Sequence, residues 1–212
     1  LTEMRDKNRV FDDVLKEAQV LGYAEADPTF DVEGIDAAHK LSILASIAFG
    51  IPLNFKAVYT EGISSIDLVD IDYAEELGYR IKHLGIARRT SAGIEMRVHP
   101  TLIPELQLLA NVNGVMNAVE IFGDPVGSTL HYGPGAGSFP TASAVVADLI
   151  DVSRAFTADP ENRVPHLAFR PAELSDLPIL DIEQTYCPFY VRLTVKDKVG
   201  VLAQITQKLA EN

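Results

Sequence analysis

The residues best suited to chemistry lie close together near the start of the chain. Asp36 and Lys40 are four residues apart, so on a helix they share one face and can form an ion pair. The largely apolar residues 41–45 follow, which predicts that the stem of Lys40 lies against a buried surface. A lysine in such a low-dielectric site loses part of its preference for the charged form unless nearby acids hold the proton. Lys40 is therefore a candidate for proton transfer.

Three acids precede this pair in a polar loop, namely Glu25, Asp27 and Asp31. Together with Asp36 and Lys40 they could form a pocket that binds a cationic amine beside one proton-transferring lysine. The spacing alone leaves a second interpretation open. An Asp–Lys pair at helical spacing is usually a weak surface ion pair, and acid-rich loops are usually solvated.

Composition excludes some classes of protein. The net charge of -12 argues against a nucleic-acid surface, which needs clustered Lys and Arg. The longest apolar stretch, residues 41–52, is too short to span a bilayer. The single Cys187 excludes an internal disulfide and fits a reducing compartment, so we expect a cytoplasmic protein. The five His residues show no metal-ligand spacing, so no metal site is predicted.

Two helices are predicted to position the candidate residues. Apolar residues recur at helical spacing over 11–21, and Gly22 then ends the helix. The polar loop 23–33 leads to a second helix from about Ile35 to Phe49, closed by Gly50. The Ala and Ser content of this second helix predicts close packing against other elements.

The middle of the chain alternates in the manner of strands. The predicted strands are residues 80–89, 94–98, 115–122 and 128–132. Short connections between consecutive strands imply antiparallel pairing, because parallel pairing needs a long crossover. We therefore expect an α/β fold in which helices pack on one face of a largely antiparallel or mixed sheet.

A Gly-rich turn, residues 133–138, precedes a predicted long helix over 141–155. Gly-rich turns before helices are common, and this one does not fit the Rossmann fingerprint because the surrounding strand–helix unit is missing. Residues 157–185 are Pro-rich and poorly periodic and are interpreted as a linker with room for one short element. A strand carrying Val191, Leu193 and Val195, then a helix from Val199, complete the chain.

The first motif resembles a known family. The run from Leu21 to Pro28, followed by residues 31–40, is similar to the signature of homoserine dehydrogenases, and residues 1–155 resemble that family's catalytic region. The resemblance implies an NAD- or NADP-dependent oxidoreductase that interconverts L-homoserine and L-aspartate 4-semialdehyde. This reaction serves the biosynthesis of threonine, methionine and isoleucine.

The resemblance also implies a role for each residue of the motif. Lys40 would be the acid/base lysine, which also stabilises negative charge on the substrate oxygen, and Asp36 would orient it. Glu25 would bind the substrate's α-ammonium with help from Asp31, and Tyr23 would line the same pocket.

The Gly-rich turn gains a role in the same way. By resemblance, Gly135, Ala136 and Gly137 would lie beside the nicotinamide end of the cofactor, and the helix over 140–156 would pack on a cofactor domain that this chain lacks. The fragment alone is therefore expected to be inactive.

The end of the chain resembles the start of an ACT domain, a βαββαβ module that binds amino acids. Residues 197–202 carry its Asp-x-x-Gly-Val-Leu core, although Val199 stands where the family usually has Pro. The resemblance divides the chain into a catalytic and dimerisation domain, residues 1–185, and a truncated ACT domain, residues 186–212. It implies L-threonine as a possible effector and a homodimer or higher oligomer.

Two alternatives stay open. The region could be an amino-acid-sensing dimerisation module without catalysis, or another dehydrogenase of small amino-acid substrates. Lys40 retained together with Glu25, Asp31 and Asp36 argues against a sensor, which needs no proton-transfer lysine. A substrate screen separates the second alternative.

Overall fold

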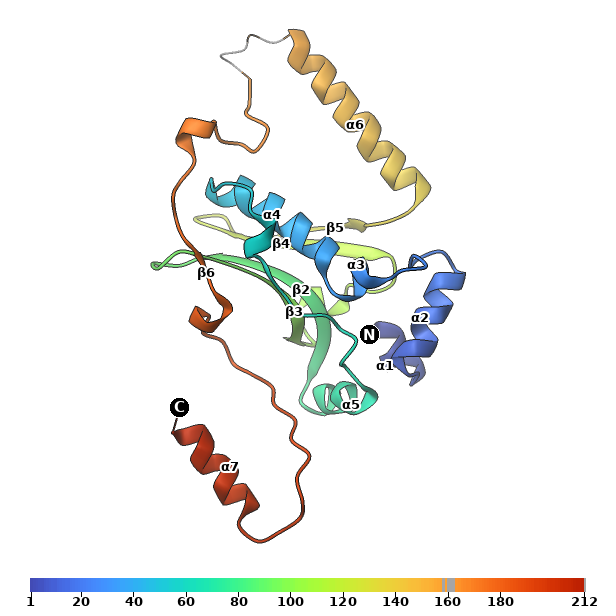
Figure 1. The fold of residues 1–212 in the computed structure, drawn as a ribbon. Helices are drawn as coiled ribbons and strands as arrows, with labels where there is room; N and C mark the ends of the chain where they lie inside the picture. Colours follow the sequence, from blue (N-terminus) through green and yellow to red (C-terminus); the bar gives the residue numbers. More distant parts are fainter. Residues whose placement is uncertain (158, 160–162, 212) are drawn as a thin grey trace.

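The structure is a computed structural model that describes residues 1–157, 159 and 163–211. Three short helices open the chain, a long helix covers a mixed sheet, and a hairpin, a second long helix and an extended tail follow (Figure 1). No helix in the described residues combines the length and the apolar character that crossing a membrane requires.

The first three helices are α1 (Thr2–Lys7), α2 (Phe11–Val20) and α3 (Thr29–Val32). The predicted helix over 11–21 is thus confirmed. The short α3 was not predicted, because the sequence places it in a polar loop. It starts where the carboxylate of Asp27 accepts hydrogen bonds from the Thr29 amide (3.1 Å) and hydroxyl (2.6 Å). These i to i+2 hydrogen bonds form an Asx turn that leads into α3, although the sequence there is weakly helical.

Helix α4 (Ile35–Phe49) confirms the second predicted helix with the same bounds. It begins after Gly34 and ends before Gly50, both in the left-handed backbone region. Its buried residues, apart from one leucine, are small: Ala38, Leu41, Ser42, Ala45 and Ser46. Small side chains let the helix lie close to the strands beneath it, as its composition predicts.

The main sheet is built around β3 (Ile94–Pro104). On one edge β3 pairs antiparallel with β2 (Tyr79–Arg89), and it also pairs in parallel with the short strands β1 (Tyr59–Thr60) and β6 (Ile179–Leu180). The predicted strands and their antiparallel pairing are confirmed, and the sheet is mixed. Helix α5 (Leu68–Glu76) packs against β2.

The core lies between α4 and one face of this sheet. It consists of apolar residues from α4, β3 and their connections: Ala38, Leu41, Ala45, Ile51, Val58, Ile94, Met96 and Val98. These apolar contacts fix α4 on the sheet, so every side chain of α4 has a defined direction relative to the sheet.

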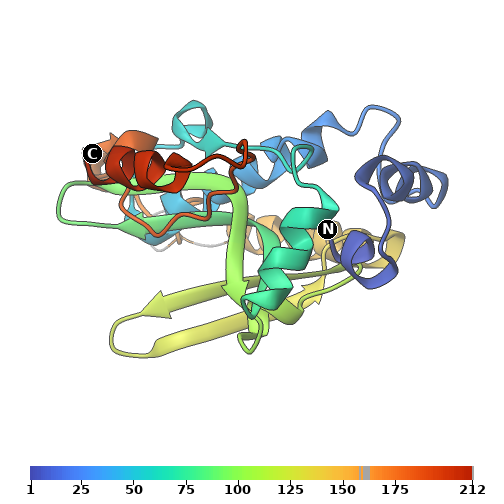
Figure 2. The ribbon, with the colours of Figure 1, turned by 90° about the horizontal axis from the view of Figure 1, so that it is seen from below.

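The second pair of predicted strands forms a separate two-stranded sheet. Strands β4 (Met116–Gly123) and β5 (Gly127–Pro134) pair antiparallel, and Figure 2 shows them apart from β2 and β3. The 3-10 helix η2 (Leu108–Asn111) and the residues after it separate β3 from β4. Helix α6 (Ser138–Thr157) follows, confirming the predicted long helix.

The tail, which is the described chain after α6, differs from two predictions. Its described part is no loose linker, because it contains η4 (Pro171–Glu173), β6 and η5 (Ile182–Gln184), and Leu177 and Ile179 pack against the core. Residues 158 and 160–162 of the predicted linker lie outside the described residues. The predicted strand at 191–195 is extended but unpaired, since no second strand lies beside it in the described chain. The last helix, α7 (Val201–Ala210), is present.

Candidate active site

Helix α4 presents Asp36 and Lys40 on one face as an ion pair. Their side chains retain 45% and 68% of their exposure, so the pair is open to solvent in this chain. The predicted burial of the Lys40 stem is therefore wrong. Successive helix residues point about 100° apart, and it is the next residue, Leu41, that faces the core.

The acidic loop before α4 is also open. Tyr23, Glu25 and Asp31 are exposed, and the side chains of the two acids form no hydrogen bond or ion pair within the described residues. The backbone of the loop is nevertheless held, because the side-chain Nε2 of Gln19 donates to the carbonyls of Glu25 (2.9 Å) and Ala26 (3.2 Å). Two carboxylates are thus presented to solvent and available to a cationic ligand.

Asp27 has a different use from the other acids. The Thr29 hydroxyl and backbone amide donate to its carboxylate and lower its pKa. Its oxygens serve to begin α3, so we do not assign Asp27 to ligand binding. This division explains why an acid-rich loop can adopt one conformation.

A single glycine joins the element that carries Asp31 to the one that carries Asp36 and Lys40. Gly34 has φ +77° and connects α3 directly to α4. Its amide donates to the Asp31 carbonyl (3.3 Å), and its own carbonyl accepts from the Ala38 amide (2.9 Å). The relative direction of α3 and α4 therefore depends on Gly34.

Sequence reasoning missed the residues that surround Gly34. His83 on β2 lies against Gly34, because a Cβ atom added at Gly34 would be 2.8 Å from the ring atom Cε1 of His83. The Nε2 of the same ring is hydrogen-bonded to the Glu61 carbonyl (2.9 Å). Glu33 accepts from the Ser64 hydroxyl (3.2 Å). The alternation of β2 contained the signal for His83, because it puts His83 on the side of Gly85, which lies against Leu41.

A second polar group lies in the sheet itself. Glu95 is buried, and Arg88 donates two hydrogen bonds to its carboxylate (2.7 and 3.1 Å), while Arg97 pairs with it from the same strand. The hydrogen bonds from Arg88, joined by Arg97, hold the pKa of Glu95 below its ordinary value against the opposing effect of burial. Glu95 and Arg97 are both buried and paired with each other, so this group stabilises the fold.

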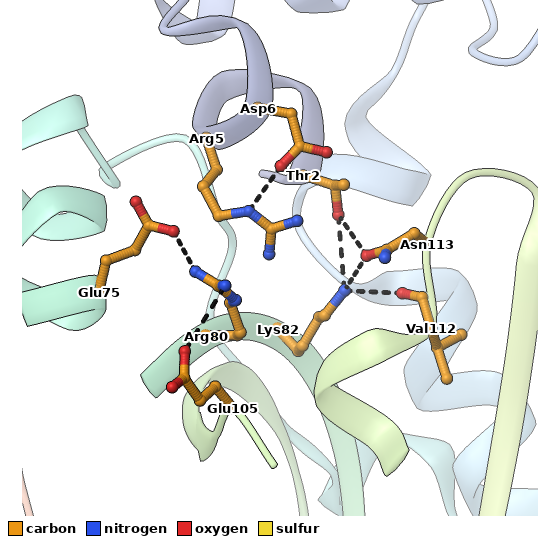
Figure 3. Close-up of polar contacts among 9 residues, drawn as sticks. All are labelled: Thr2, Arg5, Asp6, Glu75, Arg80, Lys82, Glu105, Val112 and Asn113. Atoms are coloured by element: carbon orange, nitrogen blue, oxygen red, sulfur yellow. Dashed lines mark hydrogen bonds and ion pairs between the residues drawn. The ribbon is translucent and has the colours of Figure 1, made fainter. Parts of the chain in front are cut away.

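A second lysine, Lys82, lies partly buried on β2. Burial lowers its pKa, and the charge of Arg5 adds to the effect. Its Nζ donates to the Val112 carbonyl (2.6 Å) and to Asn113 Oδ1 (2.9 Å), as Figure 3 shows. These partners join β2 to the segment before β4, so Lys82 serves as a structural tie.

The Gly-rich turn lies between β5 and α6, as predicted. Gly135, Ala136 and Gly137 are exposed, and the Gly135 amide donates to the Val115 carbonyl (3.1 Å). Gly137 has φ +124°, which favours glycine, whereas a Cβ atom at Gly135 would require the exposed Asn117 side chain to move. An exposed backbone without side chains permits the close approach of a flat ring, which fits the expected cofactor contact.

Comparison with known proteins finds relatives along the whole chain. Residues 1–150 match the family model of homoserine dehydrogenase. A homoserine dehydrogenase of Pseudomonas aeruginosa is 69% identical over 211 residues, covering 100% of this chain and 49% of that protein. The crystal structure of a homoserine dehydrogenase from Thiobacillus denitrificans has a TM-score of 0.88 and 63% identity, covering 99% of this chain and 48% of that one.

More distant structures show the same fold. A hyperthermophilic archaeal homoserine dehydrogenase in complex with NADPH is 29% identical with a TM-score of 0.58, covering 73% of this chain and 43% of that one. The chain thus spans about half the length of the relatives that it matches.

Proposed function

Because this chain belongs to the homoserine dehydrogenase family, we propose that the full-length enzyme interconverts L-homoserine and L-aspartate 4-semialdehyde with NAD or NADP. The observation that carries the proposal is the Asp36–Lys40 pair on α4, presented beside a loop with two unpaired carboxylates. This arrangement suits an alcohol that also bears an ammonium group, because one substrate then needs both a proton acceptor and an anionic anchor.

Each residue has one task in this reaction. When the alcohol is oxidised, Lys40 takes the hydroxyl proton as a neutral amine and becomes an ammonium, and the ammonium returns the proton when the aldehyde is reduced. Asp36 holds the Lys40 amine in place through the ion pair. Glu25, helped by Asp31, binds the α-ammonium of the substrate, and Tyr23 closes the side of the pocket.

The nicotinamide cofactor, when bound, accepts or supplies the hydride. The residues of this chain that fit it are Gly135, Ala136 and Gly137, whose exposed backbone allows the ring to approach. The exposed apolar side chains of α6, among them Val146, Leu149 and Ile150, suit packing against the domain that binds the rest of the cofactor. NADPH bound to the archaeal relative supports this class of cofactor.

The remaining assignments follow from the same family. Residues 1–185 form the catalytic and dimerisation domain, and residues 186–212 begin an ACT module with L-threonine as a possible effector. The protein acts in the cytoplasm as a homodimer or higher homo-oligomer, binding neither nucleic acid nor membrane. Helix α7 supports the ACT assignment, because a helix is the second element of that module.

A substrate comparison tests the proposal. The full-length enzyme should reduce NAD or NADP with L-homoserine and be much slower with 4-hydroxybutyrate, which has the same alcohol but no amine. Equal rates with both compounds would contradict an ammonium site. Binding of an amino acid without turnover of homoserine would favour the non-catalytic sensor instead.

Glu25→Gln provides the matching variant. Removal of the charge should raise the KM for L-homoserine roughly tenfold or more, because a hydrogen bond to a charged group contributes about 1.5–3 kcal/mol. The same variant should leave the rate with 4-hydroxybutyrate unchanged. A KM for L-homoserine equal to that of the wild type would remove Glu25 from the ammonium site.

A further inference from the structure

The turn that joins α3 to α4 lies directly on the imidazole ring of His83. A Cβ atom added at Gly34 would lie 2.8 Å from His83 Cε1 and 2.8 Å from Val98 Cγ1. Real Cβ atoms essentially never show such short separations, so Gly34 leaves no room for a side chain between its backbone and the side chains of His83 and Val98. The start of α4, which carries Lys40, therefore packs against one side chain of β2 and one side chain of β3.

The ring of His83 is itself fixed. Its Nε2 is hydrogen-bonded to the carbonyl of Glu61, at 2.9 Å. Glu61 follows β1 directly, and its own amide donates to the Val98 carbonyl (2.8 Å). Glu61, itself bonded to Val98, thus holds the His83 ring beside Gly34, and the ring cannot turn without breaking its bond to Glu61.

The other side of the turn is held by the segment after β1. The Ile63 amide donates to the Val32 carbonyl (3.0 Å), and the Ser64 hydroxyl donates to the Glu33 carboxylate (3.2 Å). Gly62 passes so close to Glu33 that a Cβ atom at Gly62 would overlap its carboxylate. Hydrogen bonds from Ile63 and Ser64 thus hold the two residues before Gly34, while His83 lies against Gly34 itself.

We propose that His83 is a positioning residue, which sets the distance between the ammonium-binding acid Asp31 and the proton-transferring Lys40 by fixing the turn at Gly34. This inference rests on the proposed function for its consequence in catalysis, whereas its geometric content is independent of the substrate. His83 touches neither substrate nor cofactor and acts through the direction in which α3 and α4 leave Gly34.

Kinetics of the full-length enzyme with L-homoserine test the proposal. His83→Ala removes the support, His83→Gln retains a donor in place of Nε2, and His166→Gln is the control at an exposed histidine. We expect His83→Ala to raise the KM about tenfold and to lower kcat, since small misplacements of reacting groups cost up to about 10²-fold. His83→Gln should recover most of both values, and the control should match the wild type.

A purely structural histidine gives a different result. It would lower only the folded fraction of the variant, so kcat per molecule added would fall while the KM stayed at the wild-type value. An unchanged KM in His83→Ala would therefore overturn the proposal. If His83→Ala does not fold, His83→Asn takes its place with the same expectation, because its amide is too short to reach the Glu61 carbonyl.

Hydrogen exchange separates this proposal from the assignment of the substrate. The Ala38 amide, bonded to the Gly34 carbonyl, should exchange faster in His83→Ala than in His83→Gln, whichever substrate the enzyme uses. If the wild type fails to oxidise L-homoserine but this difference appears, the proposed function falls and the role of His83 in fixing the turn stands. Equal exchange in the two variants would overturn the role of His83.

Discussion

Glu95 is the most enclosed carboxylate of the sheet, and it forms ion pairs with two arginines, Arg88 and Arg97. Its side chain keeps 3% of its exposure and that of Arg97 keeps 7%. Glu95→Gln leaves the buried guanidinium of Arg97 without a counter-charge, so the free energy of unfolding should fall by about 3 kcal/mol. Urea denaturation near neutral pH measures this change, and a loss within error of zero would show that the pair contributes nothing to stability.

The same residue predicts how stability depends on pH. Hydrogen bonds from Arg88 and Arg97 lower the pKa of Glu95 in the folded state below that of the unfolded chain. Its contribution is therefore complete above the unfolded pKa of about 4.3 and is lost as the pH falls through the folded value. The acid limb of a denaturation-versus-pH curve should be less steep in Glu95→Gln than in the wild type. Identical slopes would contradict the lowered pKa.

At the scale of single residues, spacing in the sequence predicted the Asp36–Lys40 pair but not its surroundings. The interval of four residues is a local property of a helix, so it requires no tertiary information. Which face of α4 meets the sheet depends on a packing choice between neighbours, and Leu41 rather than Lys40 occupies the core. His83 escaped notice for the same reason, because its partner Glu61 is remote in sequence and offers a backbone carbonyl.

At the scale of elements, the junction between α3 and α4 makes a sharp prediction. Gly34 and Gly22 have nearly the same φ, +77° and +75°, but only Gly34 has neighbours within reach of an added Cβ atom. Gly22→Ala should cost about 1–2 kcal/mol from backbone strain alone. Gly34→Ala should cost clearly more, because the same strain is joined by a collision with His83 and Val98. Thermal unfolding of the two variants measures the loss of stability in each. Equal losses would show that His83 and Val98 move aside at little cost.

The long helices and strands could be predicted because their periodicity is strong over many residues. Helix α4 and strands β2 to β5 lie where the pattern indicates. Helix α3 follows an Asx turn at Asp27, and strand β6 pairs with β3 through Ile94 and Ile179, which are 85 positions apart. Neither contact has a periodic signal in the sequence. Short elements defined by such single contacts were therefore missed.

At the scale of the whole molecule, the tail holds distant parts of the fold together. The Ser175 amide donates to the Gly50 carbonyl at the end of α4 (2.7 Å), and the Pro178 carbonyl accepts from the Ile94 amide (2.9 Å). Figures 1 and 2 together show the tail continuing across the face of the sheet opposite α4. Arg192 then reaches the start of α5, where it binds Asp70 (2.6 Å) and Asp67 (2.7 Å).

Arg192→Ala should release this last contact. Burial raises the pKa of Asp70, but the hydrogen bonds from Arg192, the Asp67 amide and Tyr190 outweigh it and keep the pKa low. Without Arg192 the nearly buried Asp70 carboxylate loses its counter-charge, so residues 186–198 should detach. Limited trypsin digestion of the full-length enzyme should then cut within this segment several times faster than in the Lys196→Ala control. Equal rates of cutting would show that the tail is held elsewhere.

The central claim is that Lys40 transfers the proton of the substrate alcohol, and one measurement tests it most directly. We would follow homoserine-dependent reduction of NAD and NADP by the full-length enzyme and by its Lys40→Ala and Asp36→Asn variants. Loss of a general acid–base group typically costs about 10²–10⁴-fold, so Lys40→Ala should lose at least ~10²-fold in kcat, with a smaller loss for Asp36→Asn. A Lys40→Ala variant that is folded and retains the wild-type kcat would contradict the claim.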